Sequence, residues 1–347
     1  MNFFIILLAF VPLAILAHVI GTSPVVVFFL CAAAIIPLAK FIGEATEELA
    51  ARTNPALGGF LNATFGNATE LIIGIFALHA GLIEVVKASI TGSIIGNLLF
   101  VLGLAMVCGG FRRDKQTFNL VAAQASRSTL LLAMIALIMP AIFLQTAPLV
   151  DTAVIGHLSV LIAVVLILVY GASLFFSLYT HKHLYTEDVV RYEPKWSVRR
   201  SIIILLVATL AVAWVSEILV GSIQPLVVQF GWTQLFIGVI FVAIIGNAAE
   251  HVSAVTVAIK NRMDLALNIS VGSATQIVML VAPVLVLASL FFGQPMTFVF
   301  NSFELIAILL SVFIVNLIIA DGESNWLEGV QLLVAYIIIA FAFFFHP

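Results

Sequence analysis

Long apolar runs separated by short polar connections make up almost the whole chain. A helix that crosses a bilayer needs about 20 mostly apolar residues. Stretches that meet this requirement lie at 2–20, 24–42, 57–81, 85–109, 118–144, 150–179, 199–223, 231–259, 265–292, 298–319 and 325–345. The pattern therefore predicts an all-α polytopic membrane protein with eleven transmembrane helices.

The composition is that of a chain whose main solvent is lipid. Of its 347 residues, 63% are hydrophobic and 9% are charged, and the mean hydropathy is +1.24. A soluble domain carries about 25% charged residues, so the expected partner is the lipid bilayer. The net charge of −3 argues against nucleic acid as a partner.

The basic residues in the connections are distributed unevenly. If the side of the N-terminus is named side A and the other side B, 13 of the 14 Lys and Arg residues lie on side A, and Lys87 is the exception. Basic residues accumulate on the cytoplasmic side of membrane proteins. We therefore expect a cytoplasmic N-terminus and an outside C-terminus. The lack of long tails favours a prokaryotic inner membrane.

A pentapeptide recurs in the third and eighth apolar stretches. Gly66-Asn67-Ala68-Thr69-Glu70 is followed 180 residues later by Gly246-Asn247-Ala248-Ala249-Glu250. In both copies, 22 residues separate the glutamate from a Gly-Ser pair that begins at Gly92 or Gly272. Equal spacing across two spans indicates an internal duplication.

The duplication predicts how the chain is divided. The two copies lie five spans apart, and because five is odd the two halves must cross the membrane in opposite directions. We expect an extra N-terminal helix in 1–23, a five-helix repeat in 24–179, a cytoplasmic linker in 180–198 and an inverted five-helix repeat in 199–347. Inverted repeats with a site at their interface are typical of secondary transporters.

The linker itself has two interpretations. It carries Glu187, Asp188 and Glu193 among its basic residues. It is either a solvated connection between the halves or a regulatory, ion-attracting segment.

A carboxylate in the middle of a span is costly and marks a functional site. On a helix, residues three and four apart share a face, so each pentapeptide offers a glutamate, an asparagine and a glycine together. The candidate binding residues of the two pentapeptides are Gly66, Asn67, Glu70, Gly246, Asn247 and Glu250. The alternative is that the glycines serve helix packing and that each glutamate is held by a hydrogen bond for stability.

The spans that follow add more oxygen atoms. Ser89, Ser93 and Asn97 align on one helix face, and Ser273 and Gln276 align in the second half. Such oxygen ligands suit a hard divalent cation, calcium first and manganese second, whereas zinc or copper prefers histidine or cysteine. Glu70 and Glu250 are thus the predicted metal ligands.

The same two carboxylates can take up protons. Two carboxylates close together in a dry site repel each other, which favours protonation of at least one of them. Binding of a divalent cation then displaces protons. This competition is a sufficient basis for antiport of Ca²⁺ (or Mn²⁺) against H⁺, with no cofactor.

Other polar residues lie within the spans or at their ends. His251 is either a proton relay or an interhelical hydrogen-bond donor. Glu47 and Glu48 belong to an acidic cluster at the side A end of the second span, which is either a wet interface or a cation entrance. Glu217 and Glu304 also fall within spans.

At these motifs the chain resembles the calcium/proton exchanger family of the calcium:cation antiporter superfamily. The matching stretches are Thr46-Glu47-Glu48-Leu49-Ala50, Leu61 to Ile72, Gly246 to His251, and Gly272-Ser273-Ala274-Thr275-Gln276-Ile277. The resemblance covers nearly the whole chain and implies eleven spans, inverted repeats, and calcium held between them by Glu70 and Glu250.

The resemblance also implies roles for further residues. Asn67, Asn97, Asn247 and Gln276 would be polar neighbours of the ion, and the cation or proton path would involve Glu47, Glu48 and Glu217. At this place, related sodium/calcium exchangers have a motif that resembles Gly-Thr-Ser-x-Pro-Glu. The Gly-Asn-x-x-Glu of this chain favours protons over sodium as the counter-ion.

Three other functions compete with calcium/proton exchange. A sodium-coupled calcium exchanger would use the same site, and a cation channel would line its pore with rings of residues from several subunits. An intramembrane enzyme is disfavoured because neither His-Glu-x-x-His nor Gly-x-Ser-x-Gly occurs in the sequence. The expectation is a transporter and not an enzyme, of unknown oligomeric state.

Overall fold

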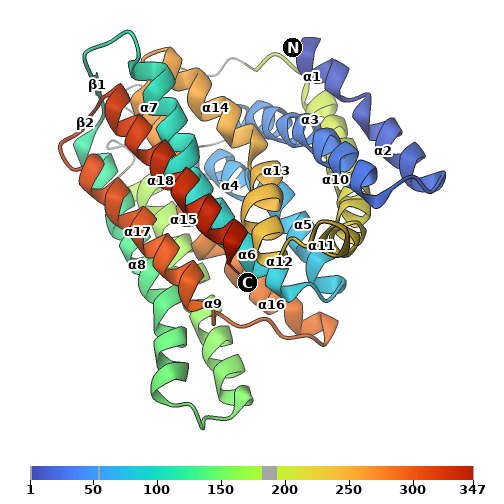
Figure 1. The fold of residues 1–347 in the computed structure, drawn as a ribbon. Helices are drawn as coiled ribbons and strands as arrows, with labels where there is room; N and C mark the ends of the chain where they lie inside the picture. The colour runs from blue at the N-terminus through green and yellow to red at the C-terminus, as the bar shows by residue number, and fades with distance from the viewer. Residues whose placement is uncertain (1, 54, 182–193, 347) are drawn as a thin grey trace.

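The computed structural model describes residues 2–53, 55–181 and 194–346, which form a bundle of tilted helices (Figure 1). The three acidic linker residues Glu187, Asp188 and Glu193 lie outside the described residues. The predicted all-helical membrane architecture is confirmed at this level, apart from one pair of two-residue strands.

Helices follow one another along each half of the chain. The first half contains α1 (Asn2–Leu7), α2 (Phe10–Val19), α3 (Pro24–Ala50), α4 (Pro55–Phe65), α5 (Ala68–His79), α6 (Ile83–Ile95), η1 (Gly96–Val101), α7 (Leu102–Gly110), β1 (Gln116–Thr117), α8 (Leu120–Thr146), α9 (Thr152–Phe175) and η2 (Phe176–Thr180). The second half contains α10 (Val198–Gly221), α11 (Ile223–Phe230), α12 (Gln234–Phe236), η4 (Ile237–Val242), α13 (Ala243–Gly246), α14 (Ala248–Ile259), α15 (Met263–Gln276), η5 (Ile277–Val281), α16 (Ala282–Ser289), η6 (Leu290–Phe292), α17 (Ser302–Ile318), β2 (Glu323–Ser324) and α18 (Trp326–Phe345).

Several of the predicted spans are built from more than one helix. By length and composition, seven helices of the described chain can cross a membrane, or eight if the bent pair Gln234–Gly246 and Ala248–Ile259 is one span. Phe4–Val19, Ala68–His79 and Ser302–Ile318 are shorter apolar helices. The count of eleven crossings therefore stays a prediction.

The stretches that carry the repeated pentapeptide are not continuous helices. Helix α4 ends at Phe65 and α5 begins at Ala68, while α13 ends at Gly246 and α14 begins at Ala248. The second break bends the span by 59°. Each glycine, asparagine and glutamate set thus straddles a break, whereas a shared face on one helix had been expected.

π-helical segments occur in the two spans that follow the breaks. Segment η1 begins at Gly96 and η5 begins at Ile277, each directly beside a residue predicted for the site. Isolated π turns within helices are rare and occur frequently at functional sites. Two of the helical irregularities therefore lie beside residues predicted for the site.

Polar contacts tie together connections that are distant in sequence. On side A, β1 pairs antiparallel with β2, Lys115 bonds to Glu323 at 2.6 Å, and the Gln116 side chain donates to Asn261 at 3.0 Å. On side B, Lys87 donates to the Val299 carbonyl at 2.9 Å, and the Gln145 amide donates to Ser302 at 3.3 Å. These contacts join connections predicted on the same side of the membrane.

Candidate functional site

Glu70 and Glu250 occupy equivalent places at two helix starts. Each lies in the first turn of its helix, α5 or α14, and each of these helices begins directly after an asparagine at the break. The backbone angles of those asparagines match closely, with φ −103° and ψ 23° at Asn67 and φ −96° and ψ 12° at Asn247. The positive end of a helix stabilises a carboxylate in its first turn, so both breaks favour an anionic side chain there.

Glu70 approaches the break in the second half because Gly246 has no side chain. A Cβ at this position would lie 3.0 Å from Cγ and 3.5 Å from Cδ of Glu70. Glu70 therefore packs against the break that precedes Glu250, and the two carboxylates interact electrostatically. The close approach of Glu70, which belongs to the other half, explains why position 246 is a glycine.

Amide and hydroxyl groups from both halves form a hydrogen-bond network around the breaks. The Asn67 amide donates to Gln276 Oε1 at 2.5 Å. The Asn97 amide donates to Asn247 Oδ1 at 2.8 Å and to Ser273 Oγ at 3.0 Å. All the residues in this network had been predicted for the site from the sequence.

Two contacts in the network are related by the internal duplication. The Asn247 amide donates to Ser93 Oγ at 2.8 Å, and Ser273 Oγ donates to Asn67 Oδ1 at 3.4 Å. Each of these pairs converts into the other when 180 is added to or subtracted from the residue numbers. The two halves thus contribute corresponding groups to one site.

Four buried oxygen atoms at this site have no hydrogen-bond partner among the residues that the structure describes. They are Oε1 and Oε2 of Glu70, Oε2 of Glu250 and Oδ1 of Asn97. Buried acceptors without a donor are costly, and all four are hard oxygen ligands of the kind that calcium prefers. Their chemistry fits a bound cation or, for the carboxylates, a bound proton.

A cavity of about 460 Å³ leads from the site toward side A. Its lining includes Gly43 near the end of α3 and Leu265 near the start of α15. The polar residues in its wall are Thr46, Glu47, Asn62, Asn67, Thr69, Glu250, Ser253, Asn268, Ser273 and Gln276. This wide and polar space allows a hydrated ion to reach Glu250 from side A.

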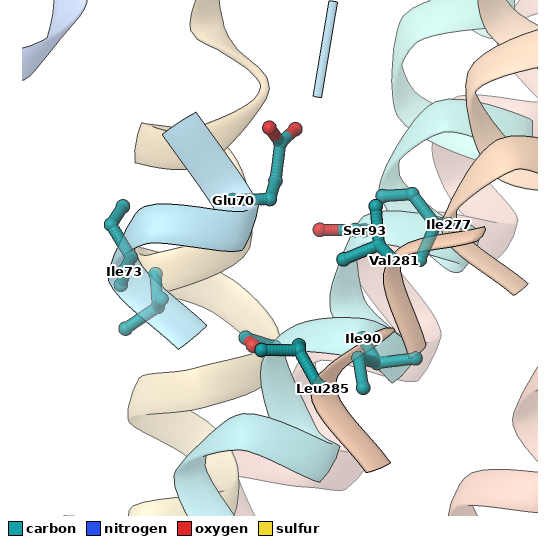
Figure 2. A pocket seen from close by; sticks show the side chains of 9 residues that line it. Glu70, Ile73, Ile90, Ser93, Ile277, Val281 and Leu285 are labelled. Carbon is teal, nitrogen blue, oxygen red and sulfur yellow. The ribbon is translucent and has the colours of Figure 1, made fainter. Parts of the chain in front are cut away.

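Toward side B, the space beyond Glu70 is small and mostly apolar. Glu70 on α5 and Ser93 on α6 line this space together with Val281 and Leu285 (Figure 2). The volume is about 10 Å³, close to the minimum that holds one water. A hydrated ion therefore does not pass this way in the present conformation.

Helix α6 and segment η4 close side B by packing backbone on backbone. A Cβ at Gly92 would overlap the Val239 carbonyl group, and a Cβ at Gly238 would overlap Ala88. Gly272, which corresponds to Gly92 in the second half, has no atom within 4 Å of where its Cβ would be. The two halves therefore pack differently. The protein is closed on side B, where Gly92 packs against η4, and open on side A, where Gly272 has no such contact.

The predicted pathway residues are not all at this cavity. Glu47 lines it, and Ser89 lines the small pocket beside Glu70. The carboxylate of Glu48 instead accepts from the backbone N–H groups of Lys195 and Trp196 at 3.0 and 2.9 Å. Glu48 thereby joins the end of α3 to the segment that precedes α10.

Two other predicted residues face different surroundings. The ring of His251 packs edge-on against Phe100, with 5.7 Å between the ring centroids. Glu217 lines a separate cavity with His18 and Trp214. Neither residue lines the cavity that contains Glu250.

Sequence reasoning missed two amides in the cavity wall. Asn62 precedes Gly66 by four residues, and Asn268 precedes Gln276 by eight with Gly272 between them. These spacings place each of them on the helix face of a predicted site residue, a signal that could have identified them.

A model of the family described as "sodium/calcium exchanger protein" matches residues 23–179 and 200–345. The chain is 50% identical to a Ca²⁺/H⁺ antiporter of Synechocystis, over 99% of this chain and 97% of that protein. It is 45% identical to the Ca²⁺/H⁺ antiporter ChaA of Bacillus subtilis, over 99% and 98% of the two chains.

A solved structure has the same fold. The structure of native YfkE superposes with a TM-score of 0.87 at 43% sequence identity, covering 99% of this chain and 100% of that one. The breaks, the cavity and the paired glutamates thus lie in a chain similar over its whole length to known ion antiporters.

Proposed function

The chain belongs to the sodium/calcium exchanger protein family, within its calcium/proton exchangers, and we propose that it exchanges calcium for protons across a membrane. It is a secondary active antiporter whose substrates are Ca²⁺ and H⁺. The observation that carries this assignment is the group of four buried, partnerless oxygen atoms on Glu70, Glu250 and Asn97.

The site chemistry explains why the two ions exclude each other. The two carboxylates lie close enough to interact electrostatically, so together they are stable with a divalent cation between them or with protons on them. A site that holds both carboxylates empty and charged is costly in a membrane. Only the loaded forms are therefore expected to change conformation.

Alternating access is supported by the asymmetry between the halves. The present conformation is open toward side A and closed toward side B by the contact of Gly92 with η4. If each repeat adopted the packing that the other repeat has now, side A would close and side B would open. We assign Glu47 to the side A entrance, because it lines the cavity there.

Eleven spans with inverted repeats in 24–179 and 199–347 remain our proposal for the topology. It is supported by the contacts between connections of the same side and by the related hydrogen bonds of Asn67 and Asn247. The basic residues of side A support a cytoplasmic N-terminus and an outside C-terminus. Under this orientation the cavity opens to the cytoplasm.

An imposed pH gradient is expected to drive calcium transport. Proteoliposomes with an acidic lumen should take up ⁴⁵Ca²⁺ against its gradient and lose the pH gradient in proportion, because each cation displaces protons. A sodium gradient at constant pH is the control and should drive no uptake. Uptake that follows sodium and ignores pH would contradict proton coupling.

Calcium affinity is expected to rise with pH. Protons and calcium compete for the same two carboxylates, so lowering the proton concentration favours the cation. The apparent Kd for calcium, measured by calorimetry in detergent, should fall as pH is raised from 6 to 8 with net proton release on binding, the sign that linkage requires for competing ligands. Manganese, the second cation expected, should compete with calcium for the same oxygen ligands.

Calcium affinity that stays constant over this pH range would contradict a shared site. The comparison requires buffers with different protonation enthalpies, so that proton release is measured directly and separated from the heat of cation binding.

A further inference from the structure

A second cavity lies between the extra N-terminal helix and the first helices of the two repeats, α3 and α10. Its volume is about 660 Å³, and it shares no lining residue with the cation cavity. Helix α2 contributes His18, the following turn contributes Thr22, and α10 contributes Trp214 and Glu217. Figure 1 shows α2, α3 and α10 side by side, in agreement with their mutual contacts.

The cavity lies at the outer end of these helices and faces lipid. The α2–α3 turn and the α10–α11 junction are both on side B, which the proposed orientation places outside. Large apolar side chains around it are exposed, with Val19 at 74%, Trp214 at 56% and Val228 at 79%. Tryptophan is enriched where the hydrocarbon meets the headgroups, so the cavity is expected at headgroup depth.

The charge in the cavity comes from Glu217. Its carboxylate forms no hydrogen bond or ion pair with another residue of the described chain, and neither lysine nor arginine lines the cavity. A carboxylate at the edge of a membrane favours a cationic partner. Across the cavity, the His18 ring supplies an N–H donor, which suits an anionic oxygen.

We propose that this cavity binds the headgroup of an outer-leaflet phospholipid that carries a primary ammonium group. The ammonium donates to the Glu217 carboxylate, the phosphate accepts from His18, and the acyl chains lie along Trp214 and the exposed apolar faces of α2 and α10. A zwitterionic headgroup matches a wall with a carboxylate on one helix and an imidazole on another.

The contacts favour this occupant over a metal ion. Calcium needs 6–8 oxygen ligands, and one carboxylate supplies two of them. The Thr22 hydroxyl already donates to the Ala17 carbonyl and the Ser222 hydroxyl to the Ile218 carbonyl, each at 2.9 Å. A primary ammonium has three N–H donors and is satisfied by Glu217 together with the free lone pairs of these hydroxyls.

The bound lipid would hold the extra helix against the repeats. Helix α2 packs on α3 and also contacts α10, and the cavity separates their outer ends. A headgroup that bridges His18 and Glu217 fills this gap. The lipid therefore links a helix outside the repeats to the two helices that begin them.

Native mass spectrometry tests the proposal with defined lipids. Purified protein is mixed with phosphatidylethanolamine, phosphatidylcholine or phosphatidylglycerol of identical acyl chains, and the fraction that retains one lipid is measured. Wild type is expected to retain phosphatidylethanolamine most, since the quaternary ammonium of phosphatidylcholine has no N–H donor. Glu217→Gln should lower that retention about tenfold, the loss of one hydrogen bond to a charged group, and leave phosphatidylglycerol retention unchanged.

The matched control removes another outer carboxylate. Asp151 is exposed and accepts a hydrogen bond from the Ala153 N–H as the cap of α9, and asparagine caps equally well. Asp151→Asn should retain phosphatidylethanolamine as wild type does.

Three results would overturn the proposal. Equal retention of phosphatidylethanolamine by wild type and Glu217→Gln would exclude Glu217 as its ligand. Equal retention of the three lipids by wild type would exclude headgroup recognition. A loss of one bound ⁴⁵Ca²⁺ in Glu217→Gln, with lipid retention unchanged, would make the cavity a cation site instead.

Discussion

Glu70→Gln and Glu250→Gln are each expected to abolish calcium uptake driven by a pH gradient. Glutamine preserves the size of the side chain but can neither carry charge nor release a proton. The site then keeps one carboxylate for a divalent cation, and calcium affinity depends strongly on ligand charge. We expect the initial rate of ⁴⁵Ca²⁺ uptake in proteoliposomes to fall by about 100-fold or more in either variant.

The two variants should nevertheless fold. Both oxygens of Glu70 and one oxygen of Glu250 lack hydrogen-bond partners in the described part of the chain, so neutralising either side chain breaks no hydrogen bond to those atoms there. The variants should therefore retain or exceed the thermal stability of wild type in detergent, because neutral amides are less costly to bury than charges. Loss of transport without loss of stability is the signature of a binding residue.

Glu304 provides the matched control, as a buried glutamate whose oxygens have donors. It is 1% exposed, accepts from the Thr91 hydroxyl at 2.9 Å, and accepts from the Asn301 N–H at 3.0 Å. Glu304→Gln is expected to lower stability by about 1–3 kcal/mol, since a buried hydrogen-bonded network is weakened, while the folded fraction still exchanges calcium. Uptake that survives in both Glu70→Gln and Glu250→Gln would refute the proposed function.

Substitution of valine at Gly272 is expected to abolish transport while the protein stays folded. In the present conformation nothing lies within 4 Å of where its Cβ would be, so the side chain is accommodated. In the opposite conformation each half would adopt the packing that the other half has now. Gly272 would then contact the backbone at Gly59, which corresponds to Val239, just as Gly92 now contacts Val239. Overlap with backbone costs about 3 kcal/mol or more, so the uptake rate should fall by about 100-fold.

The equivalent substitution in the first half should behave differently. Gly92→Val overlaps the Val239 carbonyl group already in this conformation, so it should lower both thermal stability and uptake. Gly171→Val is the control for helix propensity, because Gly171 faces open space within α9 and should leave both properties near wild type. Wild-type uptake by Gly272→Val would show that α4 and α15 do not come together during exchange.

Much of this protein follows from local patterns in its sequence. Apolar runs of span length and the one-sided basic residues predict a helical membrane protein and its orientation, because lipid exposure acts on each segment separately. The duplication at Glu70 and Glu250 predicts a paired site, since equal spacing and the odd number of intervening spans can be read along one chain. The structure places both glutamates at equivalent helix starts and packs Glu70 against the break that precedes Glu250.

Other features depend on residues that meet only after folding. The breaks at Gly66 and Gly246 replace the expected continuous helices, and Gly246 is small because Glu70 from the other half packs against it. Glu48 and Glu47 are neighbours in sequence, yet Glu47 lines the cavity and Glu48 binds the backbone before α10. The open and closed sides likewise arise from how α6 and α15 pack against partners in the opposite half. Contacts between halves set these features, and no pattern within a single segment contains them.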